Sequence, residues 1–123
     1  MSKFKQGQIW LVNFDPSFGH EYRKVRPALI IQSDQYIKPA ALLTVIPISS
    51  QINKQSELDI LLKKDIKNRL MTDSLIKTKQ ISSFDSRRFF KLIGVASEEM
   101  LEEVKANIIQ FLALESKQKS ATK

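Results

Sequence analysis

PALIIQ, residues 27–32, is a continuous apolar run that begins with a proline. A run of this kind is typical of a buried strand, and a proline is tolerated at the first position of a strand. Two further stretches flank it along the chain, QIWLVNF at residues 8–14 and LLTVIPI at residues 42–48. Both are rich in β-branched or aromatic side chains, so we expect a strand at each of them.

The second half of the chain holds shorter candidate strands. Residues 58–62 (LDILL) alternate apolar side chains with Asp59 and Leu61, which predicts a fourth strand. Residues 74–80 (SLIKTKQ) also alternate and predict a half-exposed strand, and residues 89–95 return to a strand pattern. The sheet is therefore expected to have five or six strands.

The connecting and final segments are expected to be helices and turns. Residues 63–73 mix helix and turn signals, and Asp85 can cap a single helical turn over residues 86–88. Ser97 is a good N-cap for a last, longer helix that begins with two glutamates. Its apolar side chains recur at a spacing of three or four, at Leu101, Val104, Ile108 and Phe111.

These elements predict a mainly β fold in which one long amphipathic C-terminal helix covers the sheet. Residues 1–114 are expected to form a single domain and residues 115–123 a polar, disordered tail. The chain has no cysteine and one histidine, which excludes disulfides, thiolate zinc sites and a histidine cluster for a metal. No apolar run is long enough to span a bilayer and the N-terminus lacks signal-peptide features, so we expect a cytoplasmic protein.

The charge is uneven along the chain. Its net charge is +7, and residues 1–97 carry sixteen basic and eight acidic side chains, whereas residues 98–114 carry one lysine and four glutamates. A basic surface favours a polyanionic partner through phosphate contacts and counterion release. The alternative is that the charge only keeps the protein in solution. Membrane binding is less favoured because no basic amphipathic helix is present.

Residues 15–26 predict a long loop that carries polar side chains suited to chemistry. His20 can exchange protons near neutral pH, and the adjacent Glu21 can orient it or act as a base. Arg26 directly precedes the apolar run at residues 27–32, where its guanidinium group could bind phosphate at the rim of the sheet. The alternatives are an exposed His–Glu pair and an ordinary charge that flanks a strand.

Two other polar groups lie at or near the ends of predicted strands. Ser49, Ser50 and Gln51 follow the third strand, where hydroxyl groups could bind a phosphate or a 2′-hydroxyl, or could instead cap a turn. Lys77 and Lys79 place two cations on one face of a later strand, where the alternative is a solvated edge that discourages aggregation.

Short motifs follow one another along the chain: GQIWLV at 7–12, DP at 15–16, GHE at 19–21, RPALII at 26–31, VIPISS at 45–50, and DS at 73–74 through QI at 80–81. Their order and spacing resemble the MazF/PemK (Kid) family of toxin endoribonucleases over residues 4–114. The resemblance implies an SH3-like barrel or strongly curved antiparallel sheet with the C-terminal helix packed on it, as a homodimer. It also implies metal-independent, sequence-selective cleavage of single-stranded RNA, and inhibition by an acidic antitoxin.

The resemblance also implies roles for individual residues, without a metal or cofactor. Arg26 matches the catalytic arginine of the family, Ser49 its Thr/Ser position, and His20, helped by Glu21, a histidine proposed to act in proton transfer. The residues expected to bind the RNA are Lys24, Ser50, Gln51, Lys77, Lys79 and Gln80.

The chain departs from the family pattern at the fifth strand. Members often carry an arginine, a small residue and then an acid before the glutamine, where this chain has Lys77 and Lys79. The change leaves three outcomes open: another cleaved sequence, a base role for His20 or Glu21, or weak activity. Two other functions are compatible with it, a non-catalytic protein that binds RNA or antitoxin, and a CcdB-like inhibitor of DNA gyrase.

Overall fold

A computed structural model of the chain describes residues 3–14, 25–39 and 41–115. Within these residues it has seven strands and one α-helix. The elements in chain order are β1 (Gln8–Asn13), β2 (Val25–Ile30), β3 (Leu42–Ser49), β4 (Asp59–Leu62), β5 (Ser74–Lys77), β6 (Ser82–Asp85), β7 (Phe89–Val95) and α1 (Glu98–Leu112). Short 3₁₀ turns lie at Asp34–Tyr36, Ile52–Lys54, Thr78–Gln80 and Ser86–Arg88.

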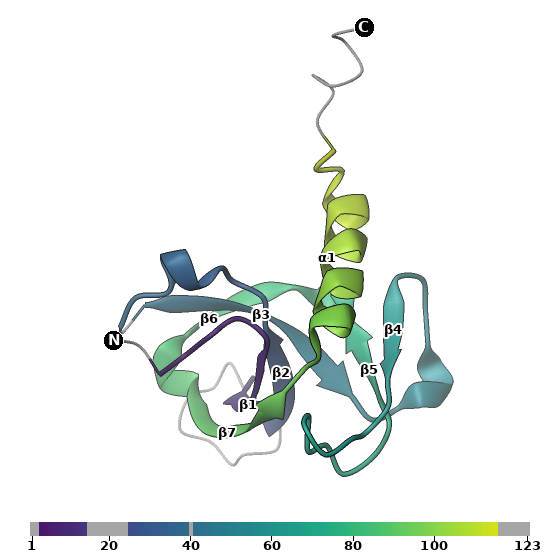
Figure 1. Cartoon of the computed structure of the whole chain (residues 1–123), viewed down its shortest axis with the longest axis horizontal. Helices are drawn as coiled ribbons and strands as arrows, with labels where there is room; N and C mark the ends of the chain where they lie inside the picture. Colours follow the sequence, from purple (N-terminus) through teal and green to yellow (C-terminus); the bar gives the residue numbers. More distant parts are fainter. Residues whose placement is uncertain (1–2, 15–24, 40, 116–123) are drawn as a thin grey trace, which may run out of the picture.

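All strand pairings are antiparallel, and the described sheet does not close on itself. The strand order is β4-β5-β3-β2-β1-β7, and β6 pairs with β3 beside this path. Figure 1 shows the strands curling strongly, with α1 extending away from them. The expected fold class is therefore confirmed in its second form, a strongly curved antiparallel sheet with one C-terminal helix.

The predicted number of strands was too low because β6 has no strand-like sequence pattern. Its residues are Ser-Ser-Phe-Asp, and they pair with the first half of β3, from Leu42↔Asp85 to Val45↔Ser82. The far end of β3 pairs with β5 instead, at Ile48↔Ile76 and Ser49↔Leu75. A 3₁₀ turn lies between β5 and β6, so the predicted strand over residues 74–80 ends at Lys77.

The core explains why the central strands are continuously apolar. Successive side chains of a strand point to opposite faces, and here both faces are covered: Trp10 belongs to one hydrophobic cluster, whereas its neighbour Ile9 belongs to the other. In β2, Ala28 and Ile30 lie in the first cluster and Leu29 in the second. The buried strand predicted at residues 27–32 is thus confirmed over residues 27–30, although β2 begins two residues earlier and ends at Ile30.

The helix α1 begins as predicted, and its first half covers one of these clusters. The Ser97 hydroxyl accepts a hydrogen bond from the Met100 N–H at 3.1 Å, and Val104 is completely buried. The expectation that Phe111 packs on the sheet was wrong, since 39% of that residue is exposed. Figure 1 shows the reason, which is that the second half of α1 extends beyond the sheet.

Candidate nucleic-acid interface

Arg26 lies within β2, rather than in the predicted loop before the strand, because the strand begins at Val25. Strand β2 pairs with β3 in antiparallel register, and Ala28 of β2 lies opposite Pro47 of β3. Beyond this pair the two strands carry Arg26 and Ser49. A guanidinium group and a hydroxyl group therefore come to the same rim of the sheet from adjacent strands.

Of the two roles considered for Ser49 from the sequence, the structure shows the capping of a turn. Its hydroxyl oxygen accepts a hydrogen bond from the Gln51 N–H at 3.2 Å, which caps the turn that leads into the 3₁₀ turn at Ile52–Lys54. This bond uses a lone pair and leaves the Ser49 O–H as a donor. Ser50 and Gln51 are exposed, so their side chains are accessible from solvent.

Two adjoining pockets share Arg26, Ser49 and Gln51. The smaller has a volume of about 210 Å³. Its other lining residues are Pro47, Lys54, Lys77 and Gln80. Arg26, Lys54 and Lys77 are cations at neutral pH, so this pocket is suited to an anionic group such as a phosphate.

The larger pocket has a volume of about 800 Å³ and a more apolar lining. One wall comes from residues 69–72, which belong to the connection between β4 and β5. Another wall comes from β7, through Lys91, Leu92 and Ile93. With Arg69 and Lys91 beside apolar side chains, this pocket can hold a flat, partly apolar group next to an anion.

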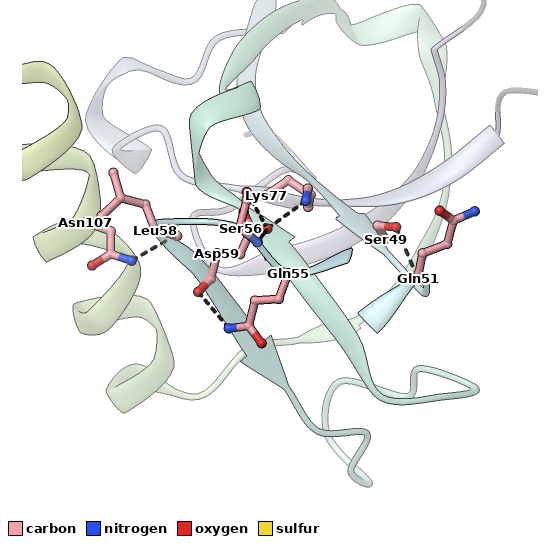
Figure 2. A network of polar contacts seen from close by, with 8 residues as sticks. All are labelled: Ser49, Gln51, Gln55, Ser56, Leu58, Asp59, Lys77 and Asn107. Atoms are coloured by element: carbon pink, nitrogen blue, oxygen red, sulfur yellow. Dashed lines mark hydrogen bonds and ion pairs between the residues drawn. The ribbon is translucent and has the colours of Figure 1, made fainter. Parts of the chain in front are cut away.

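A buried carboxylate lies beside the smaller pocket. Asp59 of β4 and Lys77 of β5 are paired across the strands, and the Lys77 Nζ lies 2.6 Å from the Asp59 Oδ2 (Figure 2). Although Asp59 and Leu61 share the other phase of the predicted alternation, the Asp59 side chain is 1% exposed, whereas Leu61 is exposed. Burial raises the pKa of Asp59, but hydrogen bonds from Lys77 and Ser56 outweigh burial and lower the pKa overall.

The turn before β4 is held in place by several further hydrogen bonds (Figure 2). The Asp59 carboxylate accepts bonds from the Ser56 N–H at 2.8 Å and the Ser56 hydroxyl at 3.1 Å. Leu58 adopts a left-handed conformation with φ 71°, and its carbonyl accepts a bond from the Asn107 side chain of α1 at 3.0 Å. The helix, through Asn107, and β4, through Asp59, thus both hold the turn that precedes the Asp59–Lys77 pair.

A family model described as PemK-like, MazF-like toxin of type II toxin-antitoxin system matches residues 5–112. The chain belongs to this family.

Known relatives agree with this assignment. Endoribonuclease MazF9 from Mycobacterium tuberculosis (strain ATCC 25618 / H37Rv) is 30% identical over 105 residues, which covers 81% of this chain and 88% of the relative. The crystal structure of MazF from Deinococcus radiodurans has a TM-score of 0.72 at 24% identity and covers 89% of this chain and 96% of its own. A mycobacterial endoribonuclease in complex with its cognate antitoxin has a TM-score of 0.71 at 12% identity, covering 92% and 98%. These structures support the fold.

The remaining predicted site residues of this MazF-like chain differ in their positions. Gln80 lines the smaller pocket, but Lys79 is an exposed residue of the 3₁₀ turn after β5 and lines neither pocket. The prediction that Lys77 and Lys79 share one strand face was wrong because the strand ends at Lys77. The predicted residues His20, Glu21 and Lys24 lie outside the described residues.

Sequence reasoning missed Lys54, Asp59, Arg69 and Lys91 in this family member. One signal could have revealed Asp59: it and Lys77 stand at equal distances from the centre of the segment that joins their strands, as cross-strand partners in a hairpin do. Among the described residues no group of three or more His, Cys, Asp or Glu side chains could hold a metal ion. No described helix is long and apolar enough to cross a membrane.

Proposed function

We propose that the protein is the toxin of a type II toxin–antitoxin system and cleaves single-stranded RNA, chiefly mRNA, at selected sequences without a metal ion. The observation that carries this proposal is the position of Arg26 and Ser49 on the common wall of two pockets, in a chain that belongs to the MazF-like toxin family. Cleavage of mRNA would arrest translation in the cytoplasm.

The smaller pocket is proposed to hold the scissile phosphate. The 2′-hydroxyl of the preceding ribose attacks the phosphorus atom, its proton is transferred to a base, and the bond to the 5′-oxygen breaks as that oxygen is protonated. The products are a 2′,3′-cyclic phosphate and a 5′-hydroxyl. Arg26 stabilises charge on the nonbridging oxygens, and the Ser49 O–H donates to one of them. His20, helped by Glu21, either accepts the proton of the 2′-hydroxyl or donates a proton to the leaving 5′-oxygen.

The larger pocket is proposed to hold a nucleotide that adjoins the scissile phosphate. Its apolar lining from Leu70, Met71 and Leu92 suits the face of a base, and Arg69 and Lys91 suit the next phosphate or a base edge. Contacts to a base in this pocket would make cleavage depend on sequence. Ser50 and Lys24 are proposed to contact the RNA backbone.

The protein is proposed to act as a homodimer that an acidic antitoxin inhibits. The net charge of +7 and the cations of the smaller pocket are complementary to an acidic peptide as well as to RNA. An antitoxin segment that covers Arg26 would exclude the substrate by occupying the same surface.

The test is incubation of the purified protein with a long, unstructured RNA in excess EDTA, followed by mapping of the product ends. We expect discrete cuts, and we expect Arg26→Ala to slow cleavage ~10²–10³-fold because it removes electrostatic stabilisation of the transition state. His20→Ala should slow it ~10²–10⁴-fold. The matched control is Lys38→Ala, an exposed cation that lines neither pocket, which should cut like the wild type.

A second substrate tests the nucleophile. RNA with a single 2′-deoxynucleotide at the mapped site should resist cleavage there, because the attacking hydroxyl is missing. Intact RNA after incubation with folded, antitoxin-free protein would overturn the proposed activity. Tight binding without products would then identify a non-catalytic RNA-binding protein, and inhibition of DNA supercoiling would identify a gyrase inhibitor.

A further inference from the structure

We propose that Asp59 is a positioning residue, which fixes the Lys77 ammonium group beside Arg26 and Ser49 so that it can contact the RNA phosphate. The inference rests on the proposed ribonuclease function and assigns a role to a residue that does not itself line either pocket. It is based on a cross-strand ion pair at the edge of the smaller pocket.

The Asp59 carboxylate is held more firmly than an ordinary surface carboxylate. One of its oxygens, Oδ2, accepts hydrogen bonds from the Lys77 Nζ at 2.6 Å, the Ser56 N–H at 2.8 Å and the Ser56 hydroxyl at 3.1 Å. Its side chain is 1% exposed and that of Lys77 is 16% exposed. The carboxylate is therefore a fixed acceptor with little freedom to move.

This fixed acceptor determines where the lysine head group lies. A lysine side chain has four rotatable carbon–carbon bonds, so a solvated lysine samples many positions. Here the backbone pairing of Asp59 with Lys77 and the short bond between their side chains select one position. An ammonium group has three N–H donors. The bond to Asp59 uses one of them, and the others can serve a phosphate in the pocket that Lys77 lines.

The pair also changes the electrostatics of the pocket. The carboxylate of Asp59, whose pKa is lowered, is charged at neutral pH and offsets part of the charge of Lys77. The charge of Asp59 therefore weakens the attraction of this pocket for RNA, while its bond to Lys77 fixes the position of the ammonium group. Removing its charge should free Lys77 to bind phosphate in unproductive positions, so binding and catalysis should respond in opposite directions.

The test measures RNA binding and cleavage separately. Asp59→Asn is nearly isosteric and keeps an oxygen that can accept from Ser56. We expect it to slow single-turnover cleavage by ~10–100-fold through misplacement of Lys77. The same variant should bind RNA blocked by a 2′-deoxynucleotide at the mapped site several-fold more tightly than the wild type. Lys77→Met should weaken binding and slow cleavage together.

The double variant distinguishes positioning from a structural role. If Asp59 acts through Lys77, Asp59→Asn should add nothing to the slower cleavage of Lys77→Met. If the two rate losses multiply, or if Asp59→Asn cleaves at the wild-type rate, the proposal is wrong. Ser56→Ala removes one bond to the carboxylate without changing its charge, and should cause a smaller loss that also vanishes in the Lys77→Met background.

The controls separate this proposal from the proposed function. Asp85→Asn removes another aspartate–cation pair, in which the Arg87 Nε lies 3.0 Å from the Asp85 Oδ1. Neither residue lines a pocket, so this variant should cleave RNA like the wild type. Thermal unfolding identifies a variant that has lost its fold, and Ser56→Ala then decides the question. Wild-type protein that leaves RNA intact would defeat the ribonuclease, whereas active wild type with an equally active Asp59→Asn would defeat only the positioning role.

Discussion

At the scale of single residues, Asp59 shows how a buried charge is accommodated in a small β protein. Burying a carboxylate disfavours its charged form unless donors replace the lost water. Ser56 supplies two of those donors from the preceding turn and Lys77 the third from the next strand. Loss of any one of them leaves the carboxylate less well compensated, so the three act as a unit.

The lowered pKa of Asp59 makes the folded state depend on pH in a defined direction. A carboxyl group whose pKa is below its ordinary value of 3.8 stabilises the fold at higher pH. That stabilisation is lost as the pH falls below about 4 through the pKa of the folded state. We expect wild type to be more stable than Asp59→Asn at pH 7, and the difference to stay constant down to about pH 5 and then to shrink toward pH 3.

Urea unfolding between pH 7 and pH 3 measures this difference. The comparison must use the free energy of unfolding of the two proteins at each pH, since Asp85, whose pKa is lowered to about 2, also titrates in acid and affects both equally. A difference between wild type and Asp59→Asn that stays constant over this range would contradict the assigned charge state of Asp59.

At the scale of elements, the connection between β4 and β5 is built around one asparagine. Asn68 is 1% exposed, and its side-chain oxygen accepts bonds from the Asp65 and Leu70 N–H groups, both at 3.0 Å. Its amide donates to the Lys63 carbonyl at 2.9 Å. The segment packs closely against β7, because a Cβ atom added at Gly94 would lie 2.4 Å from the Lys67 carbonyl oxygen. One wall of the larger pocket depends on these contacts.

Replacing Asn68 should therefore damage both stability and RNA binding. Asn68→Ala leaves buried backbone groups without partners, at a cost of about 1–3 kcal/mol each, and it should weaken binding of the blocked RNA. Gly94→Ala should do the same from the opposite side of the contact. Ile66→Ala is the matched control, since Ile66 in the same segment is 91% exposed. Unchanged RNA affinity in a destabilised Asn68→Ala protein would separate this segment from the interface.

The same elements show what the sequence could and could not predict. The strands β1, β2, β3 and β7 and the start of α1 could be predicted, because apolar composition and an N-cap serine are local signals. Pairing depends on distant residues, so the polar strand β6 was missed. The burial of Asp59 was missed for the same reason, since its partner Lys77 is eighteen positions away. The fold of residues 63–73 rests on contacts of Asn68 and Gly94 that leave no pattern in hydrophobicity.

At the scale of the whole molecule, charge and shape converge on one rim of the sheet. Strands β2, β3 and β5 and the turn at Ile52–Lys54 each contribute at least one residue to the smaller pocket. The acidic residues at the start of α1, Glu98 and Glu99, line neither pocket. RNA is therefore expected to bind at the cationic rim and not at the acidic start of the helix, because the distribution of charge selects the face that attracts a polyanion.

The salt dependence of RNA binding tests this arrangement of charge. Each phosphate that a cation neutralises contributes a slope of about −0.7 to log affinity against log salt concentration for a single strand. Lys54→Ala should reduce the steepness by about 0.7 if Lys54 of the smaller pocket contacts one phosphate. Lys105→Ala, which removes a lysine paired with Glu102 on α1, should leave the slope unchanged. Fluorescence anisotropy with the blocked RNA at 50–300 mM salt, on the order of cellular ionic strength, provides the measurement. Equal slopes for wild type and Lys54→Ala would mean that the phosphates follow another face of the protein.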